Sequence, residues 1–433
     1  MKAKYNTATV VWTLGLYYLT LAVFLAGALF PVGRVWGVSV YAGLPDALVR
    51  NAFITATLAP ILYFWLLRRH FAAAPTPRAR KFRRFVTLAF VALAATVFTL
   101  FRAQTHFGGD GYTLLGLLAA DNPLLKSREI GESLLHLWLK HVRGGDAQIA
   151  ALFSYQFISI GAGALFVGAA LYSAHRLFSD SLWRALFALG LCSGGYMLLY
   201  FGYVENYSVL ILSVSVFATL GVLSLRGAFS RWWLALVTIV ALWLHLLATF
   251  VLPALAYGLL AGTRWGRSFA EKSRGFHWAL IGAALIGGTA LLAYLYQQSM
   301  FFQLAVLLPW ATTFTINGYT LFAVDHLLDL ANLAVLLAPW LALALPLILI
   351  TRGSEEPELA VRREYRFLTI LAISALTAVC VLDPKLGLPR DWDLFAFAGP
   401  PAAALFFLTA LRGANRGFER VLLALCAASL GIF

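Results

Sequence analysis

Long apolar runs are the feature that most constrains the fold of this chain. Along its 433 residues, apolar segments alternate with short polar stretches, and many of them reach the roughly 20 residues that a helix needs to cross a bilayer. The mean hydropathy of +0.81, with only 12% charged residues, lies far outside the range of soluble domains. The runs lack the alternating apolar and polar dyads of an outer-membrane barrel. The sequence therefore predicts an all-α, polytopic transmembrane bundle, with residues 1–433 as a single domain.

Hydropathy and turn residues predict about 11–13 spans. The spans are expected near residues 9–30, 51–67, 85–102, 150–172, 183–200, 207–225, 232–246, 248–262, 278–297, 330–350, 367–381, 395–411 and from 420 onward. The stretch 232–262 is too long for one span and short for two, so we expect two short helices that meet at a turn near His245. The last apolar run reaches Phe433, which leaves open a further C-terminal portion after this residue.

The basic residues sort to one side of the predicted topology. With the N-terminus inside, 24 of the 33 Lys and Arg residues fall in inner loops such as 68–84 and 352–366, the imbalance described by the positive-inside rule. The formal net charge of +14 therefore follows from topology and does not indicate a nucleic-acid partner. The unusual polar clusters fall in the outer loops, so we expect function on the outer face.

The longest outer connection, residues 103–149, is predicted to contain a helix. Within 127–141, apolar and polar residues separate at the i, i+3, i+4, i+7 spacing of an amphipathic helix. The segment is too polar to span a bilayer. Two placements stay open: a helix in the interface with its apolar face against lipid or the spans, or a helix merely packed on the bundle.

The same connection begins with a polar, glycine-rich turn, Thr105-His-Phe-Gly-Gly-Asp-Gly-Tyr112, directly after an apolar run. Asp110 has three glycines beside it, which allow the backbone to approach a ligand closely. A carboxylate there can accept a proton from an attacking hydroxyl or bind a divalent cation; alternatively it is an ordinary turn former. His106 and Tyr112 flank Asp110 as candidate substrate-binding residues.

A second outer loop, Asp383–Asp393, combines both signs of charge with two prolines. Lys385 and Arg390 are suited to holding a phosphate, Arg390 through its planar fork, and Arg102 is a further candidate for this role. The alternative is a solvated loop whose opposite charges pair with each other. Three other residues are candidates for binding the substrate, with the indole offering a surface on which a sugar can stack: Asp391, Trp392 and Asp393.

Two ionisable residues occupy short outer connections close to hydrocarbon. Glu205 lies among tyrosines and is costly there unless it is paired or faces a wet cavity. His245, in the turn of the short helix pair, likewise requires a hydrogen-bonding partner, and both are candidate substrate-binding residues. Further along, Asp325, His326 and Asp329 have a loosely metal-like spacing, but no HExxH pattern supports zinc.

This arrangement of outer loops resembles the GT-C superfamily of integral-membrane glycosyltransferases, which contains protein O-mannosyltransferases and the bacterial aminoarabinose transferase. Asp110 would match the acid of their large first outer loop, and residues 127–141 an interface helix. The likeness is one of layout and of one acid. Three predicted spans precede Asp110 where the family usually has one, and Asp110 has no acidic neighbour in sequence. A partner carboxylate would have to come from Glu205, Asp391 or elsewhere.

The resemblance implies an inverting sugar transfer from a polyprenyl-phosphate-linked donor to an acceptor, whether glycan, lipid or protein. The expected location is the extracytoplasmic face of a bacterial inner membrane. Asp110 would act as base, with Lys385, Arg390 and Arg102 on the departing phosphate. A divalent cation, Mg²⁺ or Mn²⁺, is left open, with Asp110 as its candidate ligand.

Two other function classes remain. A transporter or flippase of a lipid-linked or anionic solute would use Glu205, His245 and Arg390 along its path, and a polymerase or ligase of surface polysaccharide would differ in its donor. A transporter is expected to place its ionisable groups near the bilayer midplane. This sequence places them at the outer ends of the predicted spans, which favours an enzyme.

Overall fold

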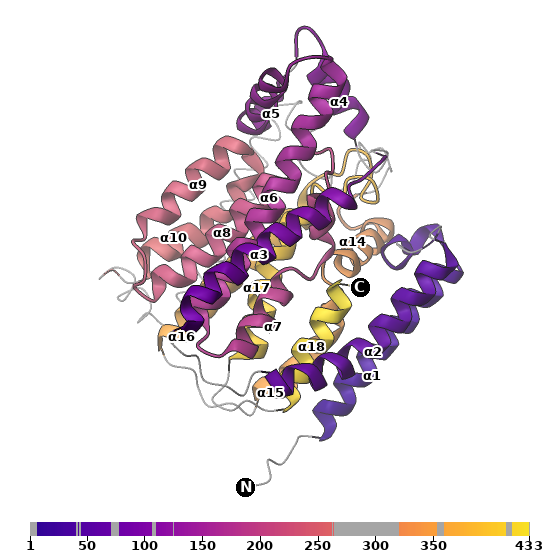
Figure 1. Cartoon of the computed structure of the whole chain (residues 1–433), viewed down its shortest axis with the longest axis vertical. Helices are drawn as coiled ribbons and strands as arrows, with labels where there is room; N and C mark the ends of the chain where they lie inside the picture. The colour runs from indigo at the N-terminus through magenta and orange to yellow at the C-terminus, as the bar shows by residue number, and fades with distance from the viewer. Residues whose placement is uncertain are drawn as a thin grey trace.

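The computed structural model describes residues 7–39, 42, 45–70, 78–105, 110–123, 125–261, 263, 320–352, 359–412 and 418–432. Across these ranges the chain forms helices and no extended strand (Figure 1). The all-α bundle predicted from hydropathy is therefore confirmed for this part of the chain. The expected span at 278–297 lies outside the described residues.

The helices follow one another with short connections. The first part of the chain contains α1 (Thr7–Leu29), η1 (Gly33–Val38), α2 (Asp46–His70), α3 (Arg78–Leu100), α4 (Gly111–Ala119), η2 (Ser127–Glu129), α5 (Ile130–Arg143), α6 (Ala147–Leu177), α7 (Ser181–Leu191), η3 (Gly195–Tyr200) and α8 (Ser208–Leu225). The second part contains α9 (Trp232–Leu244), η4 (Leu246–Val251), α10 (Leu252–Leu260), α14 (Val324–Leu337), η5 (Pro339–Leu343), α15 (Ala344–Arg352), α16 (Leu359–Val381), η6 (Ala396–Ala398), α17 (Gly399–Leu411) and α18 (Phe418–Ile432).

Four described helices are long and apolar enough to cross a membrane. They are Thr7–Leu29, Ala147–Leu177, Ser208–Leu225 and Arg362–Val381. A fifth arises if Val324–Leu337 and Pro339–Thr351 count as one span bent by 92°. This composition is compatible with a multi-pass membrane protein.

Several predicted spans are broken into shorter helices. The stretch 183–200 divides into α7 and η3 around Gly194, and 330–350 bends before Pro339, whose missing N–H cannot continue the helical ladder. The stretch 232–262 forms α9 and then η4 with α10, and the break falls at His245 with extended backbone. The short helix pair expected around His245 is therefore present.

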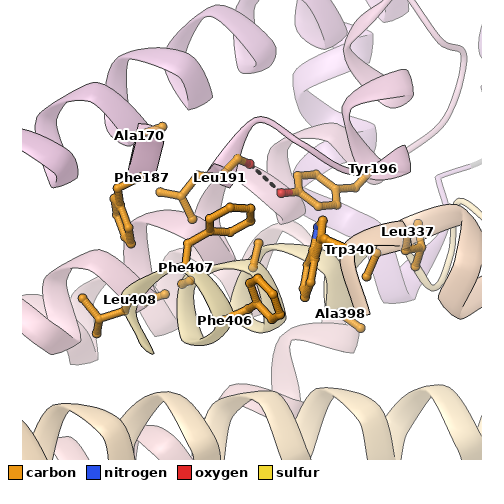
Figure 2. Packing of buried hydrophobic residues seen from close by; sticks show 14 of the residues in the cluster. Ala170, Phe187, Leu191, Tyr196, Leu337, Trp340, Ala398, Phe406, Phe407 and Leu408 are labelled. Atoms are coloured by element: carbon orange, nitrogen blue, oxygen red, sulfur yellow. Dashed lines mark hydrogen bonds between the residues drawn. The ribbon is translucent and has the colours of Figure 1, made fainter. Parts of the chain in front are cut away.

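Aromatic side chains from distant segments fill the centre of the bundle (Figure 2). Trp340 is fully buried, donates its indole N–H to the Ser193 carbonyl over 2.9 Å and packs on Phe406 and Phe407. Gly190 of α7 lies so close to Phe407 that an added Cβ would meet the ring at 2.4 Å. Truncating large aromatic side chains in such a core costs about 3–5 kcal/mol.

Four central helices have their two ends in different surroundings. Where α8 ends, α16 begins and α17 ends, Arg226 binds the buried Glu364 carboxylate with two nitrogens at 2.9 and 3.2 Å, and Arg412 pairs with the same carboxylate. Arg226 also donates to the Leu177 carbonyl at the end of α6. We call this the arginine end.

The opposite ends of α6, α8, α16 and α17 border the connections that carry Asp110, Glu205 and Asp393, and α4 and α5 lie there (top of Figure 1). We call this the acid end.

Candidate functional site

Asp110 directly precedes α4 at the acid end and is held from two sides. Its backbone N–H donates to Glu205 Oε1 over 3.2 Å, and its carboxylate Oδ2 lies 3.0 Å from the Lys126 ammonium. About a third of the side chain stays exposed. The N-terminal end of a helix and an ammonium group both stabilise a carboxylate. Asp110 is therefore a fixed carboxylate that still reaches the surface.

Lys126 connects Asp110 to a second carboxylate, Glu129. The Lys126 ammonium lies 3.8 Å from Glu129 Oε2, to which the Asn206 amide donates over 2.7 Å. His245 Nε2 lies 3.5 Å from Glu129 Oε1, and its Nδ1 accepts the Leu247 N–H at 3.0 Å, which places the imidazole proton on the nitrogen that faces Glu129. Burial raises the pKa of Glu129, but His245, Lys126 and Asn206 outweigh burial and lower this pKa to about 2.

The helix that directly follows Glu129, α5, turns a polar side inward. Glu132 and His136 are buried, whereas Trp138 is 59% exposed and Val142 65% exposed. Gly131 allows this packing, because an added Cβ would lie 2.6 Å from the Trp243 carbonyl oxygen of α9. The close approach of α5 to the end of α9 brings Glu129 next to His245. The predicted amphipathic helix is present, and its apolar side faces away from the protein.

A second lysine fixes α4 relative to α5. Lys140 donates to the carbonyls of Leu118, Ala119 and Ala120 at 2.8, 3.3 and 3.3 Å. These carbonyls belong to the C-terminal end of α4, which lacks partners within the helix. One lysine therefore contacts Asp110 at the start of α4 and another caps its end, so the helix that positions Asp110 is fastened at both termini.

Glu205 and Asp393 are two buried acids that interact electrostatically. Glu205 follows a turn in which Gly202 takes φ +66°, a conformation that favours glycine. The Tyr203 and Trp392 rings, 5.9 Å apart, join this turn to the 383–393 loop. Burial, and then the charges of Asp393 and Asp110, hold the pKa of Glu205 well above its usual range. Burial likewise raises the pKa of Asp393, and Asp391 adds to the rise.

Hydrogen bonds and an ion pair order the 383–393 loop. Asp391 accepts the Leu386 N–H over 2.7 Å, and Lys385 pairs with Asp383. Burial raises the pKa of Asp391 to about 6. Arg390 is exposed on this loop. Of the two expected phosphate ligands in the loop, Lys385 is therefore engaged by its neighbour and Arg390 faces outward.

Arg102, Tyr112 and Trp392 are the remaining sequence-predicted site residues that the structure describes. Arg102 is exposed, and its Cβ lies beside the Gly202 turn. Tyr112 is 47% exposed in the first turn of α4. Trp392 packs on Tyr203 as described above. His106 lies outside the described residues.

No group of three or more His, Cys, Asp and Glu side chains in the described ranges is arranged to hold a metal ion. Asp110 Oδ2 is paired with the Lys126 ammonium at 3.0 Å. Asp329 accepts the Trp36 indole N–H at 2.9 Å, and Asp325 pairs with Arg34 at 3.1 Å. The loosely metal-like set on α14 therefore ties this helix to η1.

Sequence reasoning did not identify Lys126, Glu129 and Asn206 as site residues. Lys126 is a single lysine in a polar stretch. Asn206 directly follows Glu205, and the charged residue is the more conspicuous of the two in the sequence. Their role depends on contacts between η2 and the turn before α8, whose partners are 77 residues apart in the case of Glu129 and Asn206. The one available signal was that Glu129 belongs to the polar side of the predicted 127–141 helix.

No family model, no curated protein and no solved structure matches this chain.

Proposed function

We propose that the protein is a membrane glycosyltransferase that moves a sugar from a polyprenyl-phosphate-linked donor to an acceptor hydroxyl. The observation that carries the proposal is the contact between Asp110 and Lys126 next to the buried acid Glu205. A carboxylate that is fixed, paired with a cation and one-third exposed suits proton transfer from a bound hydroxyl. The apolar helices beside it suit a donor that is part lipid.

The reaction is a displacement at the anomeric carbon. Asp110 accepts the proton of the acceptor hydroxyl, and the freed oxygen attacks the anomeric carbon from the side opposite to the phosphate. The bond between this carbon and the phosphate oxygen breaks, and its electron pair leaves with the polyprenyl phosphate. The ion pair with Lys126 keeps the Asp110 carboxylate oriented toward the acceptor hydroxyl while the proton is transferred.

The departing phosphate requires positive charge away from the carboxylates. Lys126 interacts electrostatically with Asp110, Glu129, Glu205 and Asp391, and Asp393 interacts with Asp110 and Asp391. A phosphate among them would be repelled, although the raised pKa values of the two buried acids reduce this repulsion. The exposed Arg102 and Arg390 are better placed at the rim, where the guanidinium fork can bind two phosphate oxygens. In this proposal Lys385 also binds the phosphate, once its ion pair with Asp383 has opened.

In this proposal the acid end faces the extracytoplasmic side of a bacterial inner membrane, and the chain has about 11–13 spans. Clustering of Arg226, Arg412 and Arg420 at the other ends of the same helices supports the orientation, because basic residues gather on the cytoplasmic side. The outward-facing Trp138 of α5 suits an interfacial position.

The test uses the purified chain in lipid nanodiscs with radiolabelled polyprenyl-phosphate sugars and membrane extracts as a source of acceptor. Wild type is expected to release polyprenyl phosphate and to label the acceptor. Asp110→Asn keeps the size and removes the base, and we expect transfer to fall about 10²–10⁴-fold. Asp121→Asn, at an exposed aspartate after α4, is the matched control. Equal transfer by both variants would exclude Asp110 as the base.

One observation favours transport as a second candidate. Glu205 and Asp393 form a buried acid pair whose pKa values are raised, and such pairs carry protons in transporters. Proteoliposomes loaded with the same radiolabelled lipid separate the two functions. Movement of intact donor between leaflets, driven by a pH gradient and without release of polyprenyl phosphate, would replace the transferase proposal.

A further inference from the structure

A small cavity lies beside Lys126, between α4, the 125–126 connection, α5, α6 and the turn before α8. Its volume of about 20 Å³ is enough for one oxygen-sized group. Lys126 lines both the cavity and the proposed catalytic contact. Leu117 and Leu125 form part of its apolar wall, and His136, Tyr155 and Asn206 contribute polar or aromatic groups. Whatever enters the cavity therefore lies next to the reacting centre.

His136, which lines this cavity, carries a hydrogen-bond acceptor without a partner among the described residues. The side chain is 1% exposed and stacks on Tyr155 with the ring centroids 3.9 Å apart. The Ser154 hydroxyl donates to the Ala151 carbonyl over 2.8 Å, so its oxygen faces His136 Nδ1, 3.5 Å away, as an acceptor. This arrangement puts the ring proton on Nδ1. His136 Nε2 is left with a lone pair and has no hydrogen-bond partner among the described residues.

Asn206 supplies a second acceptor of the same kind. It is 2% exposed, and its amide nitrogen is engaged by Glu129. Its carbonyl oxygen Oδ1 has no partner within the part of the chain that the structure describes. Buried polar atoms without partners are costly, and native proteins satisfy them with a ligand or an ordered water. Two residues that line the same cavity each carry such an atom, and we take this as an indication that a ligand group binds there.

The chemistry of the lining selects one kind of group. Two neutral acceptors, His136 Nε2 and Asn206 Oδ1, require a donor, whereas the Lys126 ammonium requires an acceptor. A hydroxyl group provides both functions in one oxygen and fits the volume. A carboxylate would meet two acceptors, and a phosphate is too large for the space.

We propose that this cavity binds one hydroxyl group of the donor sugar, which donates to His136 or Asn206 and accepts from Lys126. The inference rests on the proposed glycosyltransferase function and adds to it a residue set that recognises the sugar. It implies that the enzyme discriminates donors by a single hydroxyl. A site built to hydrogen-bond a hydroxyl rejects analogues that lack it, since its polar groups are then left unpaired.

The test measures donor binding by the full chain in nanodiscs. The probes are polyprenyl phosphate alone, polyprenyl-phosphate glucose, mannose and galactose, and the single-deoxy analogues of whichever sugar lipid binds most tightly. We expect one deoxy analogue to bind wild type at least about tenfold more weakly than its parent, and this ratio to approach one in His136→Phe. Leu125→Phe, which fills the cavity from its apolar wall and keeps His136, is expected to have the same effect. His141→Gln, at an exposed position of α5, is the matched control and should keep the wild-type ratio.

Each outcome bears on one proposal. If the sugar lipids bind more tightly than polyprenyl phosphate but no deoxy analogue is rejected, the cavity holds only water and the inference is wrong, while the transferase proposal stands. The same holds if rejection persists unchanged in both His136→Phe and Leu125→Phe. If no sugar lipid binds more tightly than polyprenyl phosphate, the proposed function itself is wrong. Should His136→Phe fail to fold, Leu125→Phe alone decides.

Discussion

The backbone N–H of Asp110 donates to the carboxylate of Glu205 across 3.2 Å, although the two residues are 95 positions apart in the chain. This contact fixes the start of α4 against the turn before α8. It leaves the Asp110 carboxylate free to turn toward Lys126. Glu205, which is 4% exposed, thereby positions Asp110 by accepting its backbone N–H.

Removing this acceptor is expected to destabilise the protein. In Glu205→Leu the Asp110 N–H loses its partner, and an unsatisfied partly buried donor costs about 1–3 kcal/mol. Glu205→Gln keeps a carbonyl oxygen in the same place and should melt close to wild type. Thermal unfolding of both variants in detergent at pH 6 measures the difference. Equal melting temperatures for Leu and Gln would show that the hydrogen bond does not support the fold.

Glu129 is expected to stabilise the protein in a pH-dependent way. Its pKa falls from 4.5 to about 2, so its contribution is complete above pH 4.5 and is lost as the pH falls toward 2. At pH 7, Glu129→Gln should lose about 1.5–3 kcal/mol, as expected for hydrogen bonds to a charged group. The gap to wild type should narrow below pH 4.5. Asp121→Asn, measured alongside, should track wild type at every pH.

The contribution of Glu132 to stability is expected to depend on pH in the opposite direction to that of Glu129. Neither of its carboxylate oxygens has a hydrogen-bond partner among the described residues, and burial, followed by the charge of Glu129, raises its pKa well above 4.5. Its contribution is therefore complete below pH 4.5 and is lost as the pH rises through the folded-state pKa. Relative to wild type, Glu132→Gln should gain stability between pH 5 and pH 9 in thermal melts. A constant difference over this range would mean that Glu132 does not titrate there.

Gly131 tests the packing that aligns Glu129 with His245. In Gly131→Ala the new Cβ would lie 2.6 Å from the Trp243 carbonyl oxygen, and overpacking of this kind typically costs about 1–3 kcal/mol. Gly116→Ala on the neighbouring α4 meets no atom within 4 Å and should be neutral or slightly stabilising. Denaturant or thermal unfolding of the pair isolates the contact. Equal stability of the two variants would show that α5 can shift away from α9 without cost.

Much of the helical architecture could be predicted from the sequence, because apolar runs of bilayer length leave few alternatives. The positions at which helices break were harder to predict. Pro339 marks one of them, but α4 escaped prediction since its nine residues give too short an apolar pattern. For 127–141, periodicity identified the helix but could not tell which side would be buried. The structure buries Glu132 and His136 and exposes Trp138.

The site was predictable in part for a similar reason. Asp110 and Glu205 stand out as acids beside apolar segments, and the structure brings them into contact. Lys126 carries no local signal, because its importance arises only when η2 meets the start of α4. Arg390 and Lys385 have a composition suited to phosphate, yet local pairing with Asp383 engages Lys385. Sequence thus reveals which groups are costly to bury, and tertiary contacts decide which of them meet.

The ion pairs of Glu364 have a mechanical consequence. By binding Arg226 and Arg412 at once, this carboxylate ties the ends of α8, α16 and α17 together, and Arg226 extends the tie to α6. Separating a buried, multiply bonded ion pair by removing one partner costs about 3–5 kcal/mol. A transport cycle that opened these helices alternately to the two sides of the membrane would have to break the ion pairs of Glu364 in every cycle. For the proposed transferase, these contacts would hold the arginine ends of the four helices together while substrate enters and leaves at the acid end.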